Sequence, residues 1–228
     1  MTAAELIAAL EALADPKVIP QVARFYAGGD PDTRVMGVSI GAIFPVAKGF
    51  AGLPLDQVEA LLDDARYEVR MAAMAVMDFQ AREKKMGDDG RKALFDLYLR
   101  RHDRINNWDL VDRAAPWVVG EYLLNRDRGL LLDLARSPDP HRRRTAIVAT
   151  WAFLRRKDAD WTFRVAALLA GDPDTYIQKA VASWTREAGK TSPEALMAFL
   201  QRHREVLPRP TLREASKLLP DEVRAQCL

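Results

Sequence analysis

Trp108 and Asp112 are the residues of this chain whose types and spacing are best suited to chemistry. They are four residues apart, and side chains at that spacing share one face of a helix. Asn106 and Asn107 precede them, and asparagine is common where helices begin. An indole offers a π surface to a cation, and an ionised carboxylate stabilises positive charge or orients water. We therefore take the stretch 106–124, NNWDLVDRAAPWVVGEYLL, as the centre of a candidate site.

The composition argues against several other kinds of protein and site. The chain has 228 residues, 49% of them apolar and 29% charged, which is ordinary for a soluble globular protein. No apolar run approaches the roughly 20 residues of a membrane-spanning helix, so we expect no membrane partner. Three scattered histidines and the single cysteine, Cys227, offer neither metal-ligand spacing nor a disulfide. The N-terminal sequence MTAAELIAALEALA predicts an amphipathic helix rather than a signal peptide, and we expect a cytoplasmic protein.

Arginine is abundant, and its placement is more informative than the net charge of +2. Basic residues cluster at 100–104, 142–144 and 155–157, all near or beyond the middle of the chain. Such clusters suggest an anionic partner such as a phosphate backbone. Solvated helix faces explain them equally well, and charge alone leaves both interpretations open.

Helical periodicity runs through almost the whole chain, which predicts an all-α fold. No stretch has the alternating β-branched pattern of strands bounded by hairpin turns. The connectors are short and contain Gly, Pro or Asp, as expected between packed helices. The predicted helices of the second half lie at 129–136, from 140 onward, and at 158–170, 175–188, 193–203 and 211–219.

A repeat is visible in the helical pattern. The segments LLDDARYEVRMAAMAVM, LARSPDPHRRRTAIVATWAF and LLAGDPDTYIQKAVASWTRE place Arg70, Arg144 and Lys179 at matching positions. The last two are 35 residues apart and the first two are 74 apart, about twice that period. Halfway between the arginines the register falls on Asn107 and Trp108. A period in the mid-thirties with two helices per unit is typical of an α–α superhelix, a solenoid of HEAT-like repeats, and we predict one domain over residues 1–228.

The second helices of successive repeats in such a stack usually line one surface. On this basis we predict that Arg70, Trp108 with Asp112, and Arg144 lie along one groove, together with Lys179 and either Ser183 or Trp184. Cations would contact phosphates there, and two indoles would bracket one nucleotide. Duplex DNA is therefore the predicted partner, with Arg143, Arg144, Lys179 and Trp184 as its contacts.

The motifs NNWDLVD, APWVVGEYLL, RRTAIVAT, IQKA and TREAGK, in this order, resemble the bacterial DNA alkylation repair family. These are AlkD-like, HEAT-like-repeat alkylpurine DNA glycosylases, and the similarity runs from about residue 20 to the C-terminus. The resemblance implies hydrolysis of the N-glycosidic bond of N3- and N7-alkylated purines in duplex DNA, with no metal or nucleotide cofactor. It implies that Asp112 is the catalytic acid, Trp108 an active-site indole and Arg144 a DNA contact near the lesion. We expect a monomer.

The chain departs from the family pattern at a few positions. The second active-site tryptophan of the family falls on Ser183, whereas this chain has Trp184, about 100° further around a helix. Gly41 and Phe44 stand where proline and arginine are usual. Two alternatives therefore stay open: a DNA-binding protein with lost or altered catalysis, and a protein-binding helical scaffold. Simpler interpretations also exist for single residues, such as an Asp112 ion pair with Arg113 or Arg144, a purely structural Asp109, or a Trp108 buried in the core.

Overall fold

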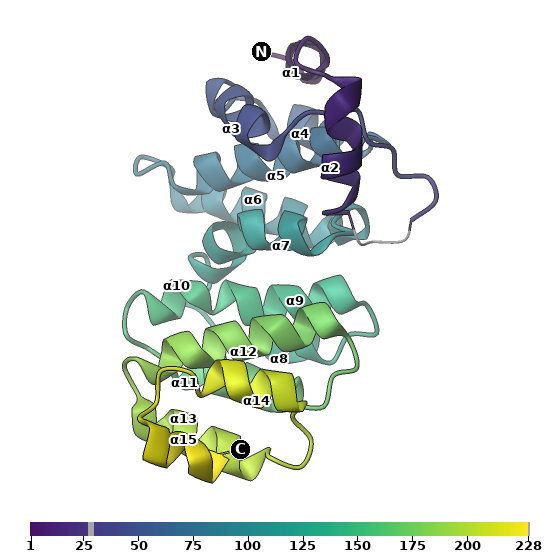
Figure 1. Ribbon diagram of the computed structural model, residues 1–228. Coiled ribbons are helices and arrows are strands. Elements are labelled where there is room, and N and C mark those ends of the chain that lie inside the picture. Colours follow the sequence, from purple (N-terminus) through teal and green to yellow (C-terminus); the bar gives the residue numbers. More distant parts are fainter. Residues whose placement is uncertain (27–29, 228) are drawn as a thin grey trace. The chain divides into compact units, whose positions relative to one another are not determined.

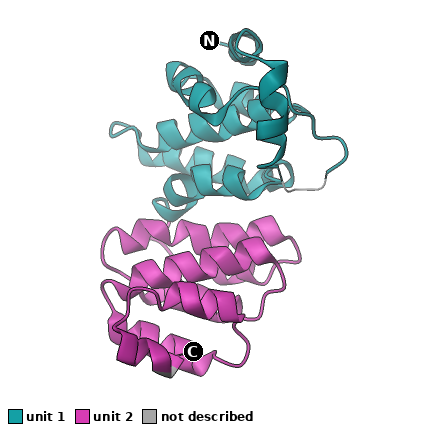
Figure 2. Ribbon diagram, viewed as in Figure 1, with its two compact units in different colours: residues 1–122 teal, residues 123–228 magenta. Residues whose placement is uncertain are grey.

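A computed structural model describes residues 1–26 and 30–227, and the chain divides into two compact units. The first is Met1–Tyr122 and the second is Leu123–Leu228 (Figure 2). Throughout the described residues the regular structure is helical, apart from one isolated bridge between Arg34 and Arg66 (Figure 1). The predicted fold class, an all-α arrangement of HEAT-like helix pairs, is confirmed. The prediction of a single domain stays a prediction.

The first unit is built around helix α5, Tyr67–Ala81, which packs against α3, α4 and α7. Every residue of α5 except Phe79 is buried, because neighbouring helices cover it on all sides. Met71, Met74 and Met77, spaced three residues apart on the helix, fill the core there. The other elements of the unit are α1 (Ala3–Glu11), η1 (Pro16–Val18), α2 (Ile19–Ala23), α3 (Ile40–Gly49), α4 (Leu55–Leu62), α6 (Asp88–Arg100), η2 (His102–Arg104), α7 (Trp108–Ala115) and η3 (Pro116–Gly120).

Glu68, a fully buried acid on α5, holds the segment that leads into α3. Its carboxylate accepts hydrogen bonds from the backbone N–H groups of Met36, Gly37 and Val38, at 2.9–3.3 Å. Three backbone donors satisfy this buried charge, which would otherwise be costly. Gly37 has a φ of +89°, and its carbonyl accepts the N–H of Asp15. The segment is thus pinned both to α5 and to the turn after α1.

The second unit has the same plan, with a 15-residue helix, α12 (Thr175–Gly189), in contact with α9, α11, α13 and α14. Aspartates begin two of its helices: Asp139 caps the backbone of α9 and Asp174 caps that of α12. The remaining elements are α8 (Gly129–Ala135), α9 (Pro140–Ala149), α10 (Trp151–Leu154), α11 (Asp160–Leu168), α13 (Pro193–Arg202), α14 (Arg209–Ala215) and α15 (Asp221–Cys227).

The helix boundaries agree broadly with the periodicity of the sequence. The N-terminal amphipathic helix is present as α1, where Thr2 and Glu5 form a reciprocal capping box. The helix expected at the centre of the chain is interrupted, since α7 ends at Ala115 and a wider helical turn begins at Pro116. Proline lacks the N–H that the helix would need at that position. Among the described helices, none has the length and apolar character needed to cross a membrane.

Candidate functional site

Helix α7 presents Trp108 and Asp112 together. Leu110, Val111, Ala114 and Ala115 form its buried side and anchor it in the first unit. Trp108 and Asp112, four residues apart, are both partly exposed. The apolar side therefore fixes the helix, and an indole and a carboxylate remain accessible on one of its other faces.

A backbone carbonyl near the end of α2 fixes the indole of Trp108. The Nε1–H of Trp108 donates to the carbonyl oxygen of Phe25 at 3.2 Å. The Nδ2 of Asn107 donates to the same oxygen at 3.0 Å. The ring is thus held at its polar edge by a segment more than 80 residues earlier in the chain.

The two asparagines before α7 do not act as the helix caps that their position suggests. Asn107 is the N-cap residue that precedes α7, but its side chain makes no capping hydrogen bond. It points instead to the Phe25 carbonyl and to Asp109. The Nδ2 of Asn106 donates to Asp30 at 2.9 Å and to the hydroxyl of Tyr26 at 3.2 Å. Both side chains are used to join α7 to the N-terminal segment.

Asp109 lies between two donors. Its Oδ1 accepts from Asn107 at 2.6 Å and its Oδ2 accepts from the hydroxyl of Tyr67. Burial raises the pKa of Asp109 to about 6, the hydrogen bonds from Tyr67 and Asn107 oppose that rise, and the charge of Asp112 adds to it. Burial and the adjacent carboxylate of Asp109 likewise raise the pKa of Tyr67. This bonding agrees with a structural Asp109.

Arg113, one of the two arginines considered as alternative partners of Asp112, pairs with an acid of another helix. Arg113 pairs with the fully buried Asp78 of α5, with 2.6 Å between Nη2 and Oδ2. Its guanidinium also lies 4.2 Å from the ring centre of Phe44. The phenylalanine that stands where the family has arginine therefore packs beneath a cation of α7.

The repeat register needs a correction at two positions. Asp112 is the fifth residue of α7, as Arg144 is of α9 and Lys179 of α12, whereas Trp108 is the first residue of its helix. Arg70 does not face a groove, because it is fully buried. Its guanidinium donates to the carbonyl of Asp64, to Thr33 and to Asn106.

Arg143 is engaged within the second unit rather than presented to a partner. Its guanidinium makes two hydrogen bonds to Asp172, at 2.6 and 3.2 Å, and donates to the carbonyls of Ser137 and Pro138. This differs from its predicted role as a DNA contact. Arg144 is only 6% exposed, and its Nη1 donates to the carbonyl of Tyr176, so it braces α9 against α12.

Lys179 is the exposed cation of the predicted set. It lies on α12 with its ammonium 5.0 Å from the ring centre of Tyr176. Ser183, one turn further along α12, is partly exposed. The two residues help to line a hollow of about 870 Å³ between α12 and the segment that begins α14.

Trp184 points away from that hollow. Its Nε1–H donates to the carbonyl of Val148 at 3.3 Å, and its ring lies edge-on to Trp151, with 6.2 Å between centres. Both rings pack on the cluster of Leu154, Ala159 and Ala188. Because one residue is about 100° around a helix, the shift from position 183 to 184 places the indole among apolar side chains. The prediction that Trp184 contacts DNA is not supported by this position.

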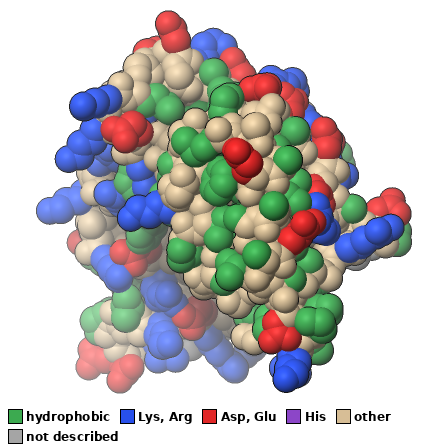
Figure 3. All heavy atoms as spheres, turned by 90° about the horizontal axis from the view of Figure 1, so that it is seen from above, with side chains coloured by type: hydrophobic (Ala, Val, Ile, Leu, Met, Phe, Trp, Pro, Cys, Tyr) green, Lys and Arg blue, Asp and Glu red, His purple; other side chains and the backbone are tan. Residues whose placement is uncertain are grey.

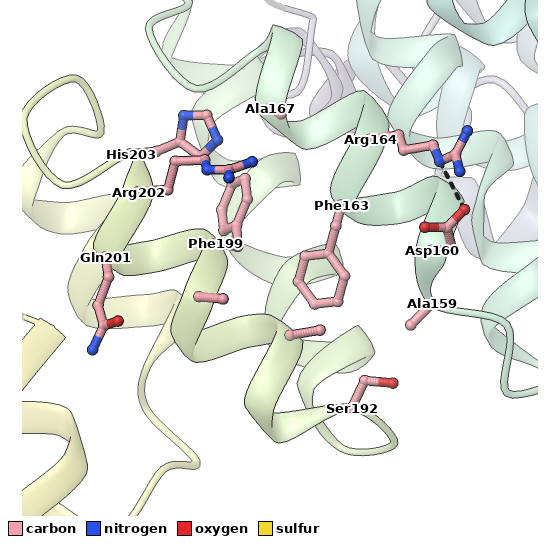
Figure 4. A pocket seen from close by; sticks show the side chains of 12 residues that line it. Ala159, Asp160, Phe163, Arg164, Ala167, Ser192, Phe199, Gln201, Arg202 and His203 are labelled. Carbon is pink, nitrogen blue, oxygen red and sulfur yellow. Dashed lines mark ion pairs between the residues drawn. The ribbon is translucent and has the colours of Figure 1, made fainter.

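A second hollow of the same unit lies between α11 and α13 and has a volume of about 890 Å³ (Figure 4). Phe163 and Phe199 form its apolar wall, with 5.7 Å between ring centres, and Arg164 pairs with Asp160 at its edge. It contains none of the residues that the sequence singles out for chemistry.

The other two basic clusters, at 100–104 and 155–157, lie in different surroundings. Arg100 and Arg101 pair with Glu59, and Arg101 also pairs with Asp63 and Asp103. Residues 155–157 are exposed at the end of α10. On the face shown in Figure 3, basic and acidic side chains are interspersed. Arg100 and Arg101 of the cluster at 100–104 are therefore engaged in ion pairs within the first unit.

Sequence reasoning missed the partners of α7. The hydroxyl of Tyr67, the carbonyl of Phe25 and the side chain of Asp30 all contact the residues around Trp108, yet none belongs to a recognisable motif. Their separation from α7 is 42 residues or more. No local signal in the sequence identifies them.

Comparison with known proteins gives a consistent result. Residues 6–219 match a family model described as DNA alkylation repair enzyme. No curated protein matches the chain. Among solved structures, a predicted DNA alkylation repair enzyme from Enterococcus faecalis is similar in fold, with a TM-score of 0.68 and 16% sequence identity. That similarity covers 91% of this chain and 97% of the other.

Proposed function

The chain belongs to the DNA alkylation repair enzyme family, and on that premise we propose that it is a monofunctional DNA glycosylase. Its substrates would be N3- and N7-alkylated purines in duplex DNA, such as 3-methyladenine and 7-methylguanine, removed during base excision repair. The observation that carries the proposal is the joint presentation of Trp108 and Asp112 on α7, with the indole fixed by the carbonyl of Phe25.

The chemistry suits these two side chains. A purine alkylated at N3 or N7 carries a positive charge and is a good leaving group, so no acid is needed to protonate it. Its departure leaves an oxocarbenium-like sugar. An ionised Asp112 would stabilise that cation and orient or deprotonate the attacking water. The π surface of Trp108 would face the cationic nucleoside.

The same arrangement would select substrates by charge. A neutral purine leaves far more slowly from the same surface, because the carboxylate and the indole stabilise positive charge that the neutral nucleoside does not carry. We propose that Lys179 contacts the phosphate backbone, since it is the exposed cation at the fifth position of a repeat helix.

The test is the release of free base from a methylated duplex. The full-length protein should release 7-methylguanine or 3-methyladenine above the spontaneous rate and should leave an unmodified duplex intact. Asp112→Asn should bind the duplex with parental affinity and release no base. Asp133→Asn, which removes an exposed carboxylate elsewhere, should excise at the parental rate. Equal excision by Asp112→Asn and the parent would show that the role given to Asp112 is wrong.

One observation favours a second candidate, a DNA-binding protein of this family with lost or altered catalysis. The resemblance places the second active-site indole at position 183, where this chain has serine beside a hollow, and Trp184 packs among apolar side chains. Salt-dependent duplex binding without release of either methylated base would support this candidate. Failure to bind duplex DNA at all would favour a protein-binding scaffold.

A further inference from the structure

A continuous hydrogen-bonded path connects α5 to the indole of Trp108. The hydroxyl of Tyr67 donates to Asp109, and the other carboxylate oxygen of Asp109 accepts from Asn107 at 2.6 Å. Asn107 in turn donates to the carbonyl of Phe25, which also accepts the Nε1–H of Trp108 at 3.2 Å. Tyr67 and Asn107 are completely buried, whereas the bond from Trp108 to Phe25 lies at the exposed end of the path.

The geometry leaves the side-chain amide of Asn107 little freedom. Its Nδ2 donates to Asp109 on one side and to the Phe25 carbonyl on the other. A charged acceptor makes the stronger bond of such a pair, because charge-assisted hydrogen bonds are roughly twice as strong as neutral ones. The ionised carboxylate of Asp109 therefore determines where the amide lies, and the amide and the indole share one carbonyl.

We propose that Asp109 is a positioning residue for base excision: ionised, it orients Asn107 and the Phe25 carbonyl, and thereby holds the indole of Trp108 in place for the substrate. The inference rests on the proposed glycosylase function. Asp109 itself touches neither the substrate nor the sugar, and its effect passes through Asn107 and the backbone of the N-terminal segment.

Protonation of Asp109 should weaken this path. Tyr67 of α5 and Asp112 of its own helix act on Asp109 directly. Glu68 of α5 and Tyr26, whose ring lies 5.8 Å from that of Tyr67, are neighbours of Tyr67. The pKa of Asp109 is raised to about 6 by burial, so it changes charge in a range where proteins are commonly assayed. Removal of the Tyr67 hydroxyl should raise that pKa further, since its hydrogen bond favours the ionised form.

The first experiment observes Trp108 directly. The full-length protein is labelled with 5-fluorotryptophan, its five tryptophan ¹⁹F signals are recorded between pH 5 and 8, and Trp108→Phe identifies the signal of interest. In the parent this signal should titrate near pH 6. In Asp109→Asn it should not titrate, and in Tyr67→Phe its midpoint should move to higher pH. The proposal would be overturned if the Trp108 signal did not change with pH, or if it titrated in Asp109→Asn as it does in the parent.

The second experiment measures single-turnover release of 7-methylguanine over the same pH range. The parent rate should fall as pH falls through 6. Asp109→Asn should be about tenfold slower at pH 7.5, with unchanged duplex affinity and no such fall, and the fall should begin at higher pH in Tyr67→Phe. If the release rate of Asp109→Asn had the same pH profile as that of the parent, the positioning role of Asp109 would be overturned. A parent that excises nothing while its ¹⁹F signal titrates as expected would reject the proposed function and leave the network established.

Discussion

Arg143 and Asp172 form a two-pronged ion pair inside the second unit, with Nε 2.6 Å from Oδ2 and Nη2 3.2 Å from Oδ1. The side chain of Asp172 is only 5% exposed, so the pair is shielded from water. It joins the start of α9 to the turn before α12. Sequence alone groups Arg143 with its neighbours as one basic run, but the structure assigns it to the fold.

Substitution of Arg143 should therefore affect stability. Arg143→Ala would leave a buried carboxylate without its cation, which should lower the free energy of unfolding by about 3 kcal/mol. Denaturant unfolding measures this directly. The matched control is Arg142→Ala, whose side chain is 41% exposed and 3.9 Å from Asp139, and it should change stability little. Equal losses in the two variants would contradict the structural role.

Lys179→Ala should give the opposite result, with unchanged stability and weaker DNA binding. Removal of one phosphate contact should lower duplex affinity about three- to tenfold and reduce the slope of log affinity against log salt by about one. Binding titrations at several salt concentrations measure both. Lys190→Ala, which removes an exposed lysine at the other end of α12, serves as the control. An unchanged slope in Lys179→Ala would show that Lys179 makes no contact with the phosphate backbone.

These contrasts show what the sequence can predict. The helices and the shared face of Trp108 and Asp112 follow from spacings within one or two turns, so periodicity reveals them. The bond from Tyr67 to Asp109 spans 42 residues and that from Asn107 to Phe25 spans 82, and no local pattern encodes either. The position of the Trp184 side chain depends on a shift of one residue around α12. Its packing against Trp151, which the sequence does not show, determines that position.

Asp78 provides a test of the contacts that support α7. It is fully buried between Arg113, at 2.6 Å, and Arg82, at 2.8 Å, and each arginine also lies over an aromatic ring. Arg113→Ala should cost about 3–5 kcal/mol, because it removes the more buried partner of a buried acid. Arg82 is 44% exposed, so Arg82→Ala should cost about 1 kcal/mol. A reversed order in denaturant unfolding would contradict this assignment.

The pH dependence of stability should report Asp109 independently of catalysis. Its pKa rises from 3.8 in the unfolded chain to about 6 in the folded protein, so the folded state binds the proton more tightly. The stabilisation is fully present below pH 3.8 and is lost as pH rises through 6. The difference amounts to about 3 kcal/mol at most. The free energy of unfolding should therefore decrease between pH 4.5 and pH 7, and the decrease should be larger in the parent than in Asp109→Asn. Equal changes in the two proteins would contradict the shifted pKa.

Gly37 and Gly41 should respond in opposite ways to the same substitution. At Gly37 the φ is +89° and an added Cβ would clash with the carbonyl oxygen of Asp15, so Gly37→Ala should cost about 2 kcal/mol or more. At Gly41, within α3, a Cβ would meet nothing within 4 Å, and Gly41→Ala should stabilise by about 0.5 kcal/mol. Thermal unfolding of both variants measures the difference.

Because Glu68 holds the segment through the N–H of Gly37, the loss of stability in Gly37→Ala should be smaller in a Glu68→Gln background, where that segment is already loosened. Fully additive losses would mean that Glu68 and Gly37 do not act together.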